Sequence, residues 1–398
     1  MTCRSTPPRW SSPSTSSGAA EVSRAPDAAG STEAAPTIAA RGPGDTWTFG
    51  AFEVHLRGEI RRLKCRRCDA VVVEAVPFAD YGSSFTRDFE DVCAAVAKEQ
   101  NRTATARLLR VSWRTVGNVI TRAVERRRIP LSERRLVRIG IDEISYRKHH
   151  KYLSLVADHD SEQIVWGGEG KSAATLDGFF DRLGPEGCAS IQLVSIDMSG
   201  AFIEAVRRRL PHAAIVFDPF HVIKLANTAT DEVRRSLVRS LRGTSGARPL
   251  KKSRWVLLKD EANLSDAERV RLAGIARLNV PLYRAYLLKE ALRAVYRAAP
   301  RRAPALLDDW LAWASRSRLE PFVKLARTVR LHRAGILAAI EHGLSNARLE
   351  GINNRVRLLS HRAFGFHSAN ALLALVYLCC GGVHVPLPHE RLRKAHPH

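Results

Sequence analysis

The chain has 398 residues and a formal net charge of +23 at pH 7, and 45% of its residues are hydrophobic. This is the composition of a soluble globular protein with two or three domains. The longest apolar run near the carboxyl end, Ala371 to Cys380, suits a buried helix and is too short to span a bilayer, which excludes a membrane protein. The excess of bases makes nucleic acid the expected partner; GC-rich coding would explain arginine in place of lysine, but not that excess.

The first segment, residues 1–50, is expected to be disordered. Met1 to Asp45 are rich in Ser, Pro, Ala, Gly and Thr and show no periodic apolar pattern. A basic stretch followed by a long apolar one is missing, so a secretory signal is not expected. The seven cysteines are mostly scattered, which fits a reducing cytoplasm.

Residues 51–82 contain half of a zinc ribbon. Cys65 and Cys68 have the C-x-x-C spacing of two zinc ligands, but a structural site needs four and no second C-x-x-C is present. The only cysteine upstream is the isolated Cys3, and His55 is a further candidate ligand. We therefore predict a partial zinc-ribbon-like segment that carries clearly less than one zinc ion per chain.

Residues 83–130 have the pattern of a helix-turn-helix domain. Ser112 can N-cap the third helix, and Pro130 stops the chain from continuing it. The apolar positions that space the helices are Phe89, Val92 and Val96, then Ala104, Ala106, Leu108 and Leu109, then Trp113, Val116, Val119 and Ile120. The candidate DNA-binding residues are Ser112, Arg114, Thr115 and Asn118, whose types suit base edges and phosphates. The alternative is an ordinary three-helix bundle with a solvated basic face.

From residue 131 the pattern changes to strands. The strands are expected at Leu136 to Ser145, Lys151 to Asp158, Gln163 to Trp166, Ile191 to Ile196 and Ala213 to Phe217, with helices at Ser172 to Leu183 and Gly200 to Leu210. Short turns make the first three strands an antiparallel meander. The order βββ-α-β-α-β is that of a ribonuclease-H-like core with a mixed five-stranded sheet.

Three carboxylates are the candidate catalytic residues. Asp142 and Asp197 each come at the end of a strand, where open α/β sheets keep their chemistry. Glu350 stands in a polar stretch with helical spacing of Leu349, Ile352 and Val356. Such oxygen ligands suit Mg²⁺ or Mn²⁺ and phosphodiester chemistry. The alternative for each aspartate is a cap on the following turn or helix.

A phosphate-binding loop is the competing motif. Gly167-Gly168-Glu169-Gly170-Lys171-Ser172 follows a strand and precedes a helix, but Val165 stands where the first glycine of such a loop is required. A glycine-rich turn that caps a helix at Ser172 is the simpler interpretation. After Phe220 the pattern is wholly helical, and about 150 residues separate Asp197 from Glu350, which predicts an all-helical insertion in the catalytic domain.

Several blocks resemble the ISL3 family of bacterial insertion-sequence transposases, in the family's order. They are Ile139 to Glu143, Ser195 to Ser199, Phe217 to Lys224, Asn346 to Asn354 and Arg362 to Phe366. The resemblance extends from about Leu63 to the end; it implies that Asp142, Asp197 and Glu350 form a DDE triad. The family usually has a complete zinc ribbon, so this chain departs from it at Cys65 and Cys68. The residues before Leu63 resemble no part of the family's amino terminus.

In the resembled family the block with Asp218 and His221 lies beside the active site. Asp218 is then a candidate fourth acid and His221 a candidate substrate contact. The alternatives are a turn-forming aspartate and a packed histidine, so we leave both outside the triad.

The sequence thus predicts a cytoplasmic DNA transposase at the bacterial nucleoid, a homodimer or higher oligomer on DNA. It would bind double-stranded terminal inverted repeats and use Mg²⁺ or Mn²⁺ to cleave 3′ ends and join them to target DNA. A repressor with a vestigial core and a nuclease without strand joining are the alternatives. The expected divisions after residue 130 are a first part of the core, 131–225, a helical insertion, 226–335, and a last part of the core with a tail, 336–398.

Overall fold

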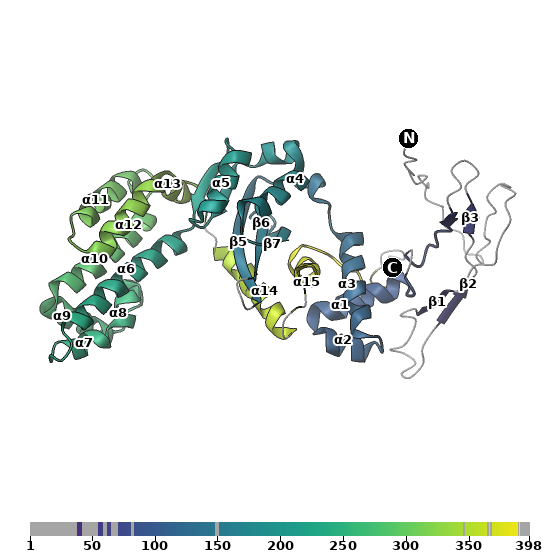
Figure 1. Cartoon of the computed structure of the whole chain (residues 1–398), viewed down its shortest axis with the longest axis horizontal. Helices are drawn as coiled ribbons and strands as arrows, with labels where there is room; N and C mark the ends of the chain where they lie inside the picture. Colours follow the sequence, from purple (N-terminus) through teal and green to yellow (C-terminus); the bar gives the residue numbers. More distant parts are fainter. Residues whose placement is uncertain are drawn as a thin grey trace, which may run out of the picture. The chain divides into compact units, whose positions relative to one another are not determined.

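The computed structural model describes residues 38–41, 55–58, 62–64, 71–80, 83–147, 151–344, 347–363, 366, 368–388 and 390. The chain divides into two compact units, Met1–Arg87 and Asp88–His398 (Figure 1). No helix within the described ranges combines the length and the apolar character needed to cross a membrane.

The described residues of the first unit form two short antiparallel strand pairs. β1 (Ile38–Arg41) pairs with β2 (His55–Gly58), and β3 (Arg62–Lys64) pairs with β4 (Val71–Val73). Residues Ile38–Arg41 therefore form a strand inside the segment expected to be disordered, and the rest of residues 1–50 lies outside the described part. Cys3, Cys65 and Cys68 also lie outside the described residues, so the partial zinc ribbon stays a prediction.

The second unit begins with the three expected helices, α1 (Arg87–Glu99), α2 (Arg102–Leu108) and α3 (Trp113–Arg127). Ser112 caps α3, as predicted, because its hydroxyl accepts a hydrogen bond of 3.0 Å from the backbone N–H of Thr115. Val116, Val119 and Ile120 are fully buried, again as predicted.

Two positions of the expected apolar stripes are wrong. Leu108 and Trp113 are both 46% exposed. Arg102 and Thr105 are buried on α2 in place of Leu108, and the Arg102 guanidinium stacks 5.0 Å from the centre of the Trp113 ring. The Trp113 ring is thus covered by the Arg102 guanidinium and not by apolar side chains of the core.

The five-stranded sheet has the predicted mixed topology, in the order β7-β6-β5-β8-β9. β5, β6 and β7 are antiparallel neighbours, whereas β8 pairs parallel to β5 and β9 pairs parallel to β8. The strands are β5 (Arg138–Arg147), β6 (Lys151–Asp158), β7 (Gln163–Glu169), β8 (Leu193–Ile196) and β9 (Ala214–Phe217). The two helices between β7 and β9 are α4 (Ala173–Ser190), kinked at Gly184, and α5 (Gly200–Arg209).

The remainder of the described chain is helical, as the sequence predicts (Figure 1). The helices before the last two are α6 (Pro219–Ser240), α7 (Ala247–Lys251), α8 (Arg254–Leu258), α9 (Asp266–Leu278), α10 (Val280–Arg297), α11 (Ala303–Ser315), α12 (Glu320–Leu331) and α13 (Arg333–His342). They extend the core of the sheet through buried leucines, tyrosines and tryptophans such as Leu288, Tyr286 and Trp310. The last two helices are α14 (Ala347–Arg362) and the buried α15 (Ala369–Cys380).

The glycine-rich turn is not a phosphate-binding loop. Gly167 and Gly168 belong to strand β7, and Ser172 caps α4 by accepting a hydrogen bond of 3.1 Å from the backbone N–H of Thr175. Gly170 has a φ of 109°, which favours glycine at the turn between strand and helix. The simpler interpretation of this motif is confirmed.

Candidate active site

Helix α14 packs unusually closely along strand β5. A Cβ atom on Gly140 would lie 2.0 Å from Cδ1 of Leu349 and 2.8 Å from Nε2 of His159, so any other residue there would force these side chains to move. One turn later on α14, the Asn353 amide donates a hydrogen bond of 2.5 Å to Oδ2 of Asp142, two residues further along β5. Four helical residues rise about 6 Å and two strand residues about 6.6 Å. α14 and β5 therefore run in the same direction, and the chain advances by similar distances along both between the two contacts.

Asp142 is a half-buried carboxylate that is hydrogen-bonded at both oxygens. Its Oδ1 accepts a hydrogen bond of 2.7 Å from the backbone N–H of Glu143. Burial raises the pKa of Asp142, and the negative charge of Asp197 raises it further. The hydrogen bond from Glu143 and the charges of His221 and Arg357 act in the opposite direction. A cation bound beside Asp142 would relieve the repulsion from Asp197.

Asp197 lies beside Asp142 because of the strand register. Gly140 pairs with Ser195 in the parallel β5–β8 ladder, and Asp142 and Asp197 each follow two residues later. Equivalent positions on neighbouring parallel strands face the same side of a sheet, about 4.8 Å apart along the hydrogen-bonding direction. Oδ1 of Asp197 also accepts a hydrogen bond of 2.9 Å from Ser199 N–H, so this aspartate shapes the turn before α5 as well.

Glu350 does not join the two aspartates. It is exposed in the first turn of α14, and among the described residues no three His, Cys, Asp or Glu side chains are grouped so that they could hold a metal ion. Its position on the helix is nevertheless close to the site. Asn353, which contacts Asp142, follows Glu350 by three residues, and Arg357, whose charge lowers the pKa of Asp142, follows it by seven. Residues at these spacings share one side of a helix.

Asp218 and His221 lie at the start of α6, next to the aspartates. Asp218 is buried, and as the N-cap of α6 it accepts a hydrogen bond of 3.4 Å from Phe220 N–H. Its Oδ2 is also 3.3 Å from Nδ1 of His221. The Asp218 carboxylate raises the pKa of His221, and the charges of Asp142 and Asp197 raise it further against the effect of burial. Asp218 is thus a cap and the partner of His221, and His221 faces the site.

The expected DNA-reading residues lie at the start of α3. Arg114 and Asn118 are exposed and one turn apart, whereas Thr115 is partly buried and bonded to Ser112 through its N–H. The other end of α3 is held to α1 by buried acids. Glu90 pairs with Arg122 at 2.5 Å and with Arg126 at 3.0 Å, and Asp91 pairs with Arg126 at 3.0 Å. These pairs orient α3 as a rigid element.

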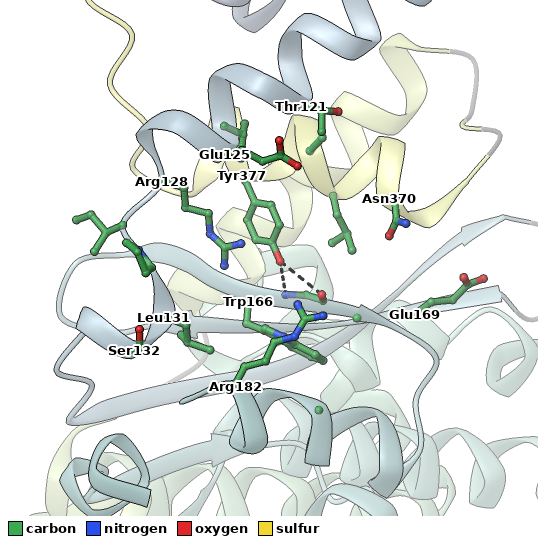
Figure 2. Close-up of a pocket in the computed structure, with 18 residues that line it drawn as sticks. Thr121, Glu125, Arg128, Leu131, Ser132, Trp166, Glu169, Arg182, Asn370 and Tyr377 are labelled. Atoms are coloured by element: carbon green, nitrogen blue, oxygen red, sulfur yellow. Dashed lines mark hydrogen bonds between the residues drawn. The ribbon is translucent and has the colours of Figure 1, made fainter. Parts of the chain in front are cut away.

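A cavity of about 710 Å³ lies between α3, α15 and β7, and none of the three candidate carboxylates lines it (Figure 2). The Arg128 guanidinium lies 3.7 Å from the centre of the Tyr377 ring and donates to Val165 O. The Tyr377 hydroxyl accepts a hydrogen bond of 2.8 Å from Gly167 N–H, which caps part of the outer edge of the sheet (Figure 2). These contacts join the three-helix domain to the β7 edge.

Comparison with known proteins identifies the family to which this chain belongs. Residues 139–376 match the DDE transposase domain of the ISL3 family, and residues 74–124 match the helix-turn-helix domain of the same family. The chain belongs to the ISL3 family of DDE transposases. The transposase for insertion sequence element IS1557 of Mycobacterium tuberculosis is 40% identical over 364 residues, 85% of this chain and 82% of that protein. The transposase for IS1001 of Bordetella parapertussis is 30% identical over 323 residues, 79% of this chain and 78% of that protein.

This ISL3 protein is therefore a transposase of an insertion sequence element, and its helix-turn-helix and transposase domains imply DNA binding. A DDE transposase also implies a divalent metal ion. The donor set fits one, because Asp142 and Asp197 offer carboxylate oxygens on one side of the sheet and repel each other without a cation. Sequence reasoning missed Asn353, since no local signal shows which part of α14 meets β5.

Proposed function

We propose that Asp142, Asp197 and Glu350 are the DDE triad of a ribonuclease-H-like core. In this proposal the transposase binds the terminal inverted repeats of its element, cleaves the 3′ ends and joins them to target DNA. The observation that carries it is the meeting of Asp142, in the middle of β5, and Asp197, directly after β8, with the helix that bears Glu350. Glu350 completes the set when the first turn of α14 brings its exposed side chain toward the aspartates.

Mg²⁺, or Mn²⁺ in its place, is the ion that these oxygen ligands favour; when bound, it supplies Lewis-acid stabilisation of the phosphodiester oxygens. Asp142, Asp197 and Glu350 would hold it. Asn353 keeps the Asp142 carboxylate in one orientation through its hydrogen bond. The neighbouring acids raise the pKa of His221, and in its protonated form this side chain would present positive charge to a DNA phosphate.

The DNA-binding proposal rests on α3. Arg114 and Asn118 face solvent on one side of this helix, and Ser112 and Thr115 close its amino-terminal turn. Side chains in the first turns of such a helix reach base edges when the helix enters the major groove. We assign direct reading of the repeat to Arg114 and Asn118, and contacts to the phosphate backbone to Ser112 and Thr115.

For the domain organisation we propose the divisions that the sequence predicts. Residues 83–130 form the DNA-binding domain, 131–225 and 336–398 form the catalytic core, and 226–335 form the helical insertion. Residues 51–82 are a zinc-ribbon-like segment in which Cys65 and Cys68 provide two ligands, too few for a closed structural site. The protein acts in the cytoplasm at the bacterial nucleoid, as a homodimer or higher oligomer that brings two element ends together on DNA.

The test uses end-labelled DNA that carries the element's inverted repeat. Asp142→Asn and Glu350→Gln should each abolish 3′ cleavage while leaving affinity for the repeat within about twofold, because neither residue is on the reading helix. Glu204→Gln, which changes an exposed acid on α5, is the matched control and should cleave normally. Cleavage that survives Glu350→Gln would remove Glu350 from the triad.

The same reactions separate the alternative functions. A strand-transfer product longer than the labelled substrate shows a transposase, and cleavage without that product shows a nuclease. Binding of the repeat without either reaction shows a repressor with a vestigial core.

A further inference from the structure

One face of α6 carries a line of exposed side chains that starts beside the half-buried His221. His221 lies on this face, and Lys224, Thr228 and Arg235 follow it within a sector of about 60° when each residue turns the helix by 100°. The opposite face is buried through Val222, Ala226, Ala229 and Val233. At 22 residues, α6 is about 33 Å long, close to one turn of B-DNA.

A basic and aromatic corner lies against the same helix. Lys251, Lys252 and Arg254 are exposed around the end of α7 and the start of α8. Trp255 is 68% exposed, with the Arg254 guanidinium 5.1 Å from its ring centre. The corner is attached to α6 because Asp231 on α6 lies 3.7 Å from Arg254, and Arg234 donates a hydrogen bond of 3.5 Å to Lys251 O.

The charges on this surface are only partly neutralised. Asp231 pairs with Arg234, Arg235 and Arg254, so one acid serves three cations, and Glu232 is a second, exposed acid on this side of α6. Lys224, Lys251 and Lys252 have no acidic partner within the described part of the chain. We call Lys224, Arg235, Lys251, Lys252, Arg254 and Trp255 the α6 track. Its excess of positive charge suits a polyanion, and an exposed indole among cations suits the sugars and bases of DNA.

The α6 track and the helix-turn-helix domain are joined to opposite edges of the sheet. Arg128, which follows α3, and Tyr377 on α15 contact β7, the first strand of the order β7-β6-β5-β8-β9. α6 begins directly after β9, the last strand. Asp142 on β5 and Asp197 after β8 come between these edges. DNA held by α3 that passes the aspartates therefore continues toward α6.

We propose that the α6 track binds the duplex DNA that lies outside the element, beyond the scissile phosphate. This inference rests on the proposed function, because it takes α3 as the holder of the inverted repeat. Lysine and arginine on an exposed helix face contact phosphates and leave base edges unread, so the binding is independent of sequence. The DNA beyond the cleavage point differs at every insertion, and only a contact of this kind can hold it.

The experiment measures the affinity of the full-length protein for two DNA duplexes. Both contain the same inverted repeat; one ends at the cleavage point and the other continues for about 20 base pairs of arbitrary flank. The wild-type protein should bind the flanked duplex more tightly. Lys251→Ala with Lys252→Ala should lower affinity for the flanked duplex roughly tenfold at low salt and reduce the slope of log K against log salt by about two. Affinity for the duplex without a flank should not change.

The matched control removes two exposed positive charges elsewhere in the helical region. Arg301 and Arg302 precede α11 as a consecutive exposed pair, like Lys251 and Lys252. Arg301→Ala with Arg302→Ala should leave both affinities unchanged. Trp255→Ala should weaken binding of the flanked duplex without changing the salt slope, because an apolar contact releases no counterions.

Two results would overturn the proposal. One is a wild-type affinity that does not depend on the flank, and the other is an equal loss for the Arg301/Arg302 variant and the Lys251/Lys252 variant. The readout is binding without metal, so it stands apart from the catalytic proposal. If wild-type protein binds the repeat but never cleaves it, the proposed function fails while the flank dependence can still be measured.

Discussion

The amide of Asn353 donates a hydrogen bond of 2.5 Å to Oδ2 of Asp142, across 211 residues of sequence. This hydrogen bond holds Oδ2 in one orientation, and the hydrogen bond from Glu143 N–H holds Oδ1 in the same way. A carboxylate held at both oxygens cannot rotate freely, so its remaining lone pairs point in defined directions. We therefore expect Asn353 to act through Asp142, as a positioning residue.

Asn353→Ala should lower the rate of 3′ cleavage about 10–100-fold, the usual cost of losing a partner of a metal-binding side chain. The same change should raise the concentration of Mg²⁺ needed for half-maximal rate, because Asp142 would lose its preferred orientation. Cleavage measured across a magnesium titration checks both effects. Affinity for the inverted repeat should stay the same.

Asn354→Ala is the control for that variant. Asn354 is exposed on the same helix and accepts a hydrogen bond of 2.8 Å from Arg357. Its loss should alter the cleavage rate by less than about threefold, within the small range expected of surface changes. An Asn354 effect as large as that of Asn353 would mean that both act through the stability of α14.

Asp142→Asn should stabilise the metal-free protein at neutral pH. Burial raises the pKa of Asp142 above its ordinary value of 3.8, so the folded state favours the protonated form. The tighter binding of this proton stabilises the folded state relative to the unfolded state. The stabilisation is fully present below pH 3.8 and is lost as the pH rises through the raised pKa. Asparagine does not ionise and avoids that loss.

Thermal unfolding without metal at pH 3.5 and at pH 7 checks this prediction. The unfolding temperature of the variant should exceed that of the wild type at pH 7, and the two should differ little at pH 3.5. Added Mg²⁺ should raise the unfolding temperature of wild type more than that of the variant. An equal benefit of asparagine at both pH values would show that ionisation of Asp142 is not the cause.

The sequence predicts the strands and both aspartates because their signals are local. β-prone runs identify both strands, and Asp197 directly follows β8 as predicted, but Asp142 is not at a strand end because β5 continues to Arg147. The strand register then places the two aspartates side by side. Asn353, Leu349 and Gly140 form their contacts through packing between segments about 210 residues apart, and no periodicity reports which turn of α14 meets β5. Trp113 and Leu108 were misjudged for a related reason. Both residues are apolar and stand at the spacing of a buried helix face, but Arg102 is buried where they were expected to pack.

Arg114→Ala should weaken binding to the inverted repeat more than binding to random DNA. A bidentate contact to a base is worth about 1–3 kcal/mol of discrimination, whereas loss of a phosphate contact weakens all sequences alike. Competition binding at fixed salt measures the ratio. Arg107→Ala removes an exposed arginine from α2, and we expect it to lower both affinities equally. If the two variants behave alike, Arg114 contacts the phosphate backbone.

Arg362 connects the end of α14 with the end of α1. Its guanidinium donates hydrogen bonds of 2.8 Å to Glu99 O, 3.1 Å to Lys98 O and 3.3 Å to Ala97 O. These are among the last carbonyls of α1, which have no partners within the helix and carry its negative partial charge. Since α14 also carries Glu350 and Asn353, Arg362 links the helix-turn-helix region to the helix that we propose completes the active site.

Arg362→Ala should therefore destabilise the end of α1 by about 1–2 kcal/mol, the upper range for a cation at a helix carboxyl terminus. Amide hydrogen exchange of residues 97–101 should become faster by roughly tenfold, since 1.4 kcal/mol corresponds to a factor of ten. Arg362→Lys keeps the charge with fewer donors and should restore part of the protection. Unchanged exchange in the alanine variant would show that α1 is held by its buried pairs with Arg122 and Arg126 alone.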